Sequence, residues 1–442
     1  MKRGVAVVLI GASRVGSARL VTALVIALAA VLAASVLALV AARTAEAAFP
    51  GGNGKIAFQS DRHGPVEIYA MTSRETARRI TTSNKSSDPS YSPDGRRIAF
   101  ISGSKTNSSY EVWVMNADGS GRRQVTKTSV AEQEPGWSPD GTKLVYASNS
   151  FDKDRQTDLE IWTINVDGTE RRQLTNNSSS ETQPAWSPDG SRIAFVRGQD
   201  VWVMNSDGSG TDANLTPNSP PGCSPDCYGG IDDHPSWSPD GTQIVYSNNG
   251  DGDADLHKMD ANPVTPPDPD DNLTDANVGK DLEPAWSPGG DKIAYVATTP
   301  TSTDHNIYVI DANAPGSGTA IDTIVANDVS PDWQPITLAV NDVRIREKST
   351  NAAFTVNLPT ASSETITVNY ATADGTARTP TDYTAQSGTL TFEPGQTTQQ
   401  ISAPIRGDRR NESNEFFFVN LSGATNAVIS DAQGRATIVD ND

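Results

Sequence analysis

Short runs of apolar residues recur through most of the chain and alternate with polar segments rich in Gly, Asp, Ser and Asn. Examples are Lys143-Leu-Val-Tyr146 and Arg192-Ile-Ala-Phe-Val196, whose β-branched and aromatic side chains favour strands. The polar segments contain Ser-Pro-Asp-Gly and Asn-x-Asp-Gly, in which Pro, Asp and Gly favour tight turns. The pattern therefore predicts an all-β chain of short hairpins.

The turn sequence is part of an internal repeat. An aromatic residue followed by Ser-Pro-Asp-Gly occurs four times, then as the variant Trp286-Ser-Pro-Gly-Gly290 and the remnant Trp333-Gln-Pro335. The aromatic residues are Tyr91, Trp137, Trp186, Trp237, Trp286 and Trp333. Their spacing of 46–51 residues predicts one four-stranded sheet per repeat in a β-propeller.

The two ends of the repeat region predict how the propeller closes. Residues 54–81 supply second, third and fourth strands, whereas Val329–Trp333 supplies only a first strand. One sheet built from both ends would remove exposed sheet edges. We therefore expect six blades. The repeats in residues 52–336 resemble those of TolB-type propellers, which implies the same fold.

Residues 337–442 lack the repeat and contain alternating strands such as Ala353–Leu358 and Phe416–Leu421, typical of a Greek-key sandwich. The segments Val368–Ala377, Ser387–Gly395 and Ile438–Asp442 resemble Calx-β domains. That resemblance implies a calcium site formed by Glu347, Asp382, Asp408, Glu412, Asp440 and Asp442. Carboxylates suit Ca²⁺, which takes six to eight oxygen ligands. The alternative is a set of solvated surface acids without a metal.

The N-terminus predicts export. Four basic residues precede the apolar run Leu20–Ala42, and Ala45-Glu46-Ala47 follows as a small-x-small cleavage sequence. Residues 1–47 are therefore expected to be a signal peptide, with an uncleaved membrane anchor through Leu20–Ala42 as the alternative. The protein would be secreted, periplasmic or associated with the cell surface. Its formal net charge of −19 argues against a nucleic-acid partner.

The only two cysteines are Cys223 and Cys227, four residues apart. In an exported protein we expect them to form a disulfide that holds one loop. A zinc site would need about four ligands, and His234 alone is near.

The sequence contains no Gly-x-Ser-x-Gly or His-Glu-x-x-His motif, so we predict no enzymatic activity. Each first strand has one residue immediately before its proline, and first strands line the central channel of a propeller. These residues are Asp88, Glu134, Gln183, His234, Glu283 and Ser330. They could form a site for a polar ligand or a cation, or simply a solvated channel rim.

These features predict a signal peptide (1–47), a six-bladed propeller (48–336) and a Calx-β-like domain (337–442). The expected function is that of an exported binding or adhesion protein whose partner is an envelope protein or a surface polysaccharide. One alternative is a metal-dependent channel enzyme acting on carbohydrate or peptide, as in oligogalacturonate lyases, or a hydrolase. Another is a membrane-anchored sensor in cell communication.

Overall fold

The structure is a computed structural model. It describes residues 52–72, 77–83, 85–103, 109–149, 158–217, 231–250, 253–262, 272–274, 279–299, 302–316, 318–321, 326–359, 361–362, 364–407, 410 and 412–440. No helix in these ranges is long and apolar enough to cross a membrane. The predicted signal segment and Cys223 and Cys227 lie outside the described residues.

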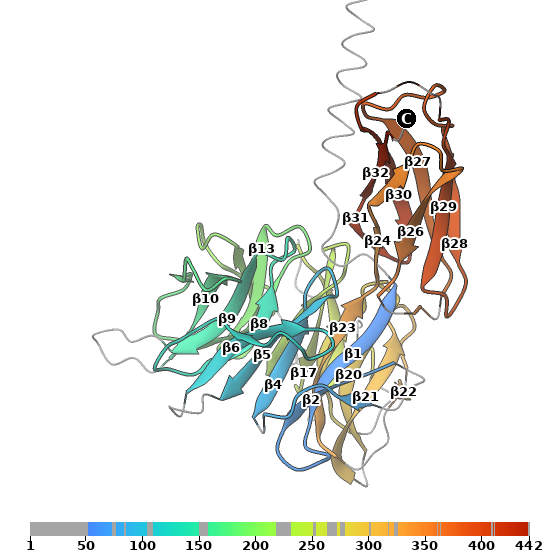
Figure 1. Cartoon of the computed structure of the whole chain (residues 1–442). Helices are drawn as coiled ribbons and strands as arrows, with labels where there is room; N and C mark the ends of the chain where they lie inside the picture. The colour runs from blue at the N-terminus through green and yellow to red at the C-terminus, as the bar shows by residue number, and fades with distance from the viewer. Residues whose placement is uncertain are drawn as a thin grey trace, which may run out of the picture. The chain divides into compact units, whose positions relative to one another are not determined.

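Strands between Asn53 and Pro335 form six antiparallel sheets in the part of the chain that the structure describes (Figure 1). The first sheet contains β23 (Asp328–Pro335), β1 (Asn53–Ser60), β2 (Glu67–Met71) and β3 (Arg78–Arg79). The second contains β4 (Ser86–Tyr91), β5 (Arg97–Gly103), β6 (Tyr110–Asn116) and β7 (Arg123–Gln124). The third contains β8 (Glu132–Trp137), β9 (Lys143–Asn149), β10 (Leu159–Asn165) and β11 (Arg172–Gln173).

The fourth sheet contains β12 (Glu181–Trp186), β13 (Arg192–Arg197), β14 (Asp200–Asn205) and β15 (Ala213–Asn214). The fifth contains β16 (Asp232–Trp237), β17 (Gln243–Asn248) and β18 (Asp255–Asp260). The sixth contains β19 (Asp281–Trp286), β20 (Lys292–Thr299), β21 (Ser302–Asp311) and β22 (Thr319–Ala320). The fifth sheet therefore has three described strands, and a single bridge between His257 and Asn272 stands where its fourth strand was expected. The all-β prediction is confirmed.

The repeated turn forms because its side chains satisfy its own backbone. In the third sheet, Ser138 Oγ donates to Asp140 Oδ1 at 2.6 Å, and the N–H of Thr142 donates to the same oxygen at 3.0 Å. Gly141 closes the turn with a φ of 66°, a left-handed conformation that glycine adopts without steric cost. Each such turn reverses the chain direction between the first and the second strand of its sheet.

The second strands form the core of each sheet. In β9, five consecutive residues from Leu144 to Ser148 are buried, because neighbouring sheets cover both faces of the strand. This explains why these strands are continuous apolar runs in the sequence, with no alternation. The first and last parts of the repeat region also meet as predicted, since β1 pairs antiparallel with β23 and Ile56 lies opposite Trp333.

Residues from Thr337 onward form two further sheets. One contains β29 (Thr398–Pro404), β26 (Asn351–Asn357), β24 (Thr337–Val340) and β31 (Val428–Asp431). The other contains β25 (Val343–Arg346), β32 (Gln433–Val439), β30 (Glu415–Thr425), β27 (Ile366–Asp374) and β28 (Ser387–Phe392). The sheets enclose one apolar core, in which the ring of Tyr383 stacks on Phe417 with centroids 4.1 Å apart. The sandwich prediction is confirmed.

Candidate functional site

An irregularity in each first strand turns one side chain toward the centre of the propeller. The residues before the repeat proline, here called the rim residues, are Asp88, Glu134, Gln183, His234, Glu283 and Ser330, and all six have a positive φ of 49–54°. The register of the first strand shifts around all six of them, as between Thr182 and Ala185 in β12. A left-handed conformation costs a residue other than glycine about 1–2 kcal/mol. The same strain at six equivalent positions marks a site that the fold maintains.

Rim residues are linked from one sheet to the next through side-chain oxygens. The backbone N–H of Gln183 donates to Glu134 Oε2 at 2.6 Å, and that of His234 donates to Gln183 Oε1 at 2.8 Å. The N–H of Ser330 donates to Glu283 Oε2 at 2.5 Å in the same way. For Asp88 the acceptor comes from β1, because the backbone N–H of Asp88 donates to Gln59 Oε1 at 2.9 Å. These bonds hold the rim side chains in fixed positions around the centre.

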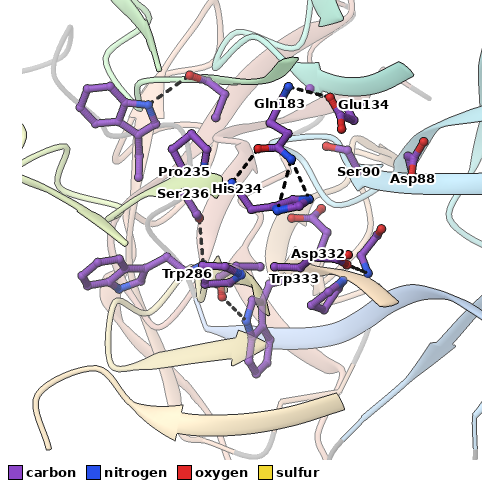
Figure 2. Close-up of a pocket in the computed structure, with 18 of the residues that line it drawn as sticks. Asp88, Ser90, Glu134, Gln183, His234, Pro235, Ser236, Trp286, Asp332 and Trp333 are labelled. Carbon is purple, nitrogen blue, oxygen red and sulfur yellow. Dashed lines mark hydrogen bonds between the residues drawn. The ribbon is translucent and has the colours of Figure 1, made fainter. Parts of the chain in front are cut away.

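All six rim residues line one cavity of about 400 Å³. Figure 2 shows Glu134, Gln183 and His234 pointing toward one another from three successive sheets. Gln183 Nε2 lies 3.2 Å from His234 Nε2. The described lining includes Asp332 as a further acid but no lysine or arginine, so its charged groups are carboxyl groups.

Burial shifts the protonation of these groups toward their neutral forms. It raises the pKa of Asp88 to about 6, with a further contribution from the charge of Glu283. It raises the pKa of Glu134 to about 7, where Asp88 and Glu283 also contribute. Burial lowers the pKa of His234 to about 4, so this imidazole is neutral at pH 7. The cavity therefore gains negative charge as the pH rises through about 6–7.

Sequence reasoning missed Asp332 as a cavity residue. Its Oδ2 accepts the backbone N–H of Tyr91 at 2.5 Å, and burial raises the pKa of its carboxyl group to about 7. The residue before the repeat aromatic is small in the other repeats, as in Gly136 and Ala185, and is an acid only in the last one. This acid in place of a small residue was the feature of the sequence that could have identified Asp332 as a cavity residue.

The cavity does not gather the chain's histidines. Among the described cavity-lining residues His234 is the only one. His63 Nδ1 lies 2.8 Å from the Tyr69 hydroxyl, the His257 ring packs against Tyr246, and His305 Nδ1 lies 3.3 Å from Asn327 Oδ1.

A second group of acids lies at one end of the sandwich. Four of the six predicted calcium ligands, Glu347, Asp382, Glu412 and Asp440, line one small cavity there, whereas Asp408 and Asp442 lie outside the described residues. The sequence analysis did not select Glu415 or Arg406, which line the same cavity. Within the described ranges, no three His, Cys, Asp or Glu side chains are placed to hold a metal ion.

Strand ends position these acids. Glu347 follows β25, where its N–H donates to Val439 O at 3.0 Å, and Asp440 follows β32. Asp440 Oδ2 accepts the N–H of Glu412 at 2.7 Å. Burial raises the pKa of Glu415 to about 7, and the charges of Asp382, Glu412 and Glu347 raise it further. Carboxylates that repel one another in this way fit the oxygen chemistry of calcium, because a divalent cation would relieve the repulsion.

Comparisons with known proteins match both parts of the chain. The model of the TolB beta propeller domain matches residues 24–157 and 89–226, and the model of the Calx-beta domain matches residues 332–442. The structure of TolB from Acinetobacter baumannii is similar in fold, with a TM-score of 0.51 and 18% identity over 64% of this chain and 67% of that chain.

The curated relatives match a short region. Sodium/calcium exchanger 2 from Rattus norvegicus is 41% identical over 70 residues, which are 16% of this chain and 7% of the exchanger. Adhesion G-protein coupled receptor V1 from Danio rerio is 38% identical over 79 residues, which are 17% of this chain and 1% of the receptor. The chain thus spans a small fraction of the length of either relative.

Proposed function

Starting from a chain that joins a TolB-like β-propeller to a C-terminal Calx-β domain, we propose that the protein is an exported binding protein of the cell envelope or the extracellular space. Its propeller cavity recognises a ligand, and its Calx-β domain binds calcium. The observation that supports recognition is the convergence of six equivalent rim residues, all with positive φ, on one cavity.

The cavity favours a ligand with a positively charged group. Asp88, Glu134, Glu283 and Asp332 line it, and no lysine or arginine in the described lining offsets their charge. An ammonium or guanidinium group would pair with these carboxylates and donate hydrogen bonds to their oxygens, which ionised carboxylates can only accept. A lysine or arginine side chain of an envelope protein, or an amino sugar of a surface polysaccharide, has this chemistry.

Binding is favoured over catalysis by the histidine positions. The channel enzyme considered as the alternative requires several converging imidazoles, and three of the four histidines make contacts outside the cavity lining. The sensor alternative depends on retention of Leu20–Ala42, which N-terminal sequencing of the mature protein would test.

The recognition proposal is tested with labelled peptides that end in lysine or arginine, compared with acetylated and acidic counterparts. We expect fluorescence anisotropy to show binding of the cationic peptides only. Binding should weaken at least tenfold in Glu134→Gln and remain unchanged in Glu364→Gln, which alters an exposed acid outside the propeller. Equal binding of neutral and cationic peptides, or none, would contradict the proposal.

For the Calx-β domain, the residues that would hold Ca²⁺ are Glu347, Asp382, Glu412, Glu415 and Asp440. Calorimetric titration of the full chain with CaCl₂ tests this assignment. We expect a binding heat that disappears in Glu347→Gln and Asp440→Asn. Heat that is unchanged in both variants would place any calcium elsewhere.

A further inference from the structure

Two glutamates face each other where the third and fourth sheets meet. Glu160 belongs to β10 and Glu181 is the first residue of β12, and both are 0% exposed. Buried carboxylates are costly unless they are neutralised or paired. The contacts of these two side chains therefore show how the junction tolerates them.

Asn177 bridges the two carboxyl groups through one oxygen of each. Its backbone N–H donates to Glu160 Oε1 at 3.0 Å, and its side-chain Nδ2 donates to Glu181 Oε1 at 2.7 Å. The second oxygens, Glu160 Oε2 and Glu181 Oε2, are buried and receive no hydrogen bond from any donor in the described structure.

Positive charge at this junction is insufficient for two carboxylates. Arg197 Nε donates to Glu181 Oε1 at 2.7 Å, but the same guanidinium also donates to Asp212 Oδ2 at 2.7 Å. One guanidinium thus already pairs with two acids, Glu181 and Asp212, and Glu160 is a third acid at the same junction. Asp158, two residues before Glu160, adds a further carboxyl group on the side of β10.

We propose that Glu160 and Glu181 share one proton between their Oε2 atoms, which makes the junction of the third and fourth sheets a pH-sensitive contact. A carboxylic acid donates to a neighbouring carboxylate, and this bond satisfies both oxygens that otherwise have no partner. Loss of the proton leaves two buried negative charges close together, and their repulsion weakens the contact.

The protonation of Glu160 agrees with this geometry. Burial raises the pKa of Glu160 to about 7, against the opposing hydrogen bonds from Thr175 and the N–H of Asn177, and the neighbouring carboxyl group of Glu181 raises it further. The group is therefore protonated in the folded protein at pH values where it is ionised in the unfolded chain.

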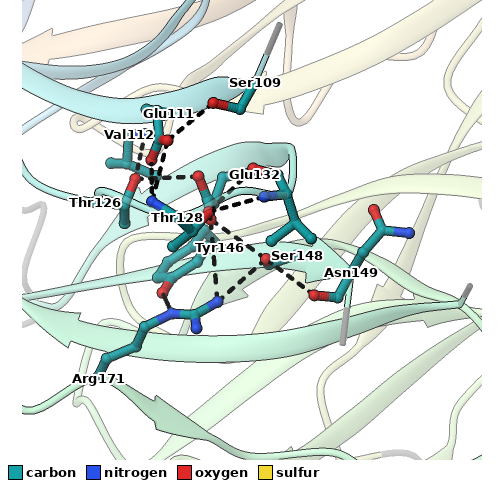
Figure 3. A network of polar contacts seen from close by, with 11 residues as sticks. Ser109, Glu111, Val112, Thr126, Thr128, Glu132, Tyr146, Ser148, Asn149 and Arg171 are labelled. Carbon is teal, nitrogen blue, oxygen red and sulfur yellow. Dashed lines mark hydrogen bonds and ion pairs between the residues drawn. The ribbon is translucent and has the colours of Figure 1, made fainter. Parts of the chain in front are cut away.

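The preceding junction also brings two buried glutamates together, but there Thr126 donates to Glu132 Oε2 and neither glutamate has an unpaired oxygen. Figure 3 shows Glu111 of β6 and Glu132 of β8 in a network with Thr126, Thr128 and Arg171. Thr128 donates to both glutamates, through its N–H to Glu111 at 3.1 Å and through its Oγ1 to Glu132 Oε1 at 2.6 Å. Arg171 Nη2 is 4.0 Å from Glu132, too far for a direct hydrogen bond, and Arg171 Nε instead donates to the Tyr146 hydroxyl. Burial raises the pKa of Glu132 to about 7, and the charge of Glu111 contributes.

The glutamate contacts between sheets lie beside the cavity. The proposal about them does not depend on which ligand the cavity binds. Glu132 and Glu181 each stand two residues before a rim residue on the same strand, Glu134 in β8 and Gln183 in β12. The proton shared by Glu160 and Glu181 therefore connects two neighbouring sheets next to the rim.

The direction of the pH effect follows from the two states. Below about pH 4.5, the ordinary pKa of a glutamate, the Glu160 carboxyl is protonated in both the folded and the unfolded chain, so its proton does not change the stability there. As the pH rises from there to about 7, only the folded state keeps the proton, so stability falls. Above that range the loss is complete.

The test compares the full chain with Glu160→Gln, whose amide can donate to Glu181 Oε2 at every pH. We expect the uptake of protons on folding near pH 6 to decrease by about one in this variant, and its melting temperature to depend less on pH between about 5.5 and 8. Infrared difference spectra near pH 6 should lose a protonated carboxyl band. The matched control is Glu170→Gln, whose side chain is 73% exposed and which should behave as the native protein.

Glu111→Gln provides a second readout at the other junction if Glu160→Gln does not fold. A variant that folds and retains the full pH dependence and the infrared band would overturn the proposal. A reduced pH dependence in Glu170→Gln as large as in Glu160→Gln would do the same.

Discussion

The guanidinium of Arg62 donates to Asp328 Oδ2 at 2.6 Å and joins residues 266 positions apart in the sequence. Arg62 follows β1, and Asp328 begins β23, so the pair lies in the sheet that both ends of the propeller build. The guanidinium also lies 5.0 Å from the ring centroids of Phe58 and Tyr69. Both charged side chains are almost fully buried, which makes this ion pair part of the closure of the propeller.

We expect Arg62→Met to destabilise the propeller by about 3–5 kcal/mol, because Asp328 loses the guanidinium that compensates its buried charge. Chemical denaturation followed by tryptophan fluorescence measures the change. Arg122→Met is the control, since Arg122 is exposed and should change stability by less than about 0.5 kcal/mol. Equal stability of the two variants would show that the closure does not depend on this pair.

Glu170 stands where two other repeats have glycine, and its φ is 53°. The corresponding residues are Gly121 and Gly210, with φ values of 64° and 85°. We expect Glu170→Gly to stabilise the protein by about 0.5–1 kcal/mol, because glycine adopts this conformation without steric cost. The exposed contact of Glu170 with Lys143 at 3.4 Å contributes little.

The reverse change provides the control in the same kind of turn. Gly121→Ala should destabilise the protein by about 1–2 kcal/mol, since the new Cβ would lie 2.9 Å from Asn116 Nδ2 in a left-handed conformation. Thermal melting of both variants measures the two effects. Melting temperatures that shift in the same direction would contradict the interpretation.

Binding of a cationic peptide to the cavity should strengthen as the pH rises from about 5 to 8. Asp88, with a pKa of about 6, and Glu134, with a pKa of about 7, become ionised over this range. Anisotropy titrations at several pH values measure the affinity, and Glu134→Gln should reduce the pH dependence. Affinity that falls with rising pH would argue against carboxylate recognition.

Calcium binding near pH 6.5 should release protons. Glu415, with a pKa of about 7, is partly protonated at this pH, and a cation among Glu347, Asp382 and Glu412 would favour its ionised form. Calorimetry in buffers of different ionisation enthalpy measures the release. Glu415→Gln should lower the release by less than one proton and weaken calcium binding, whereas Glu393→Gln, an exposed acid of the same domain, should change neither.

Local patterns allowed the rim residues to be selected before their geometry was known. Gln183 and His234 precede the repeat proline at equivalent positions, so a propeller must place them at equivalent points around its centre. Their positive φ could not be predicted, because residues other than glycine adopt it only when surrounding structure compensates the strain. Asp332 escaped selection because it occupies a different position in its repeat.

The acid pairs between sheets were also not predictable. In the sequence, Glu160 and Glu181 are polar residues near the starts of strands. Nothing in their spacing of 21 residues indicates that they are in contact. Whether a carboxyl group is ionised depends on burial and on neighbours, which the packing of two sheets determines.

By itself, the sequence determined the all-β class, the repeat, the pairing of the first and last propeller strands and the resemblance of each part to a known domain, because turns and apolar runs are local and recur in phase. Only the tertiary structure decided which side chains share a cavity, which acids face each other, and how each is protonated. These properties arise from contacts between residues distant in the sequence, such as Arg62 and Asp328, and from the loss of water around them.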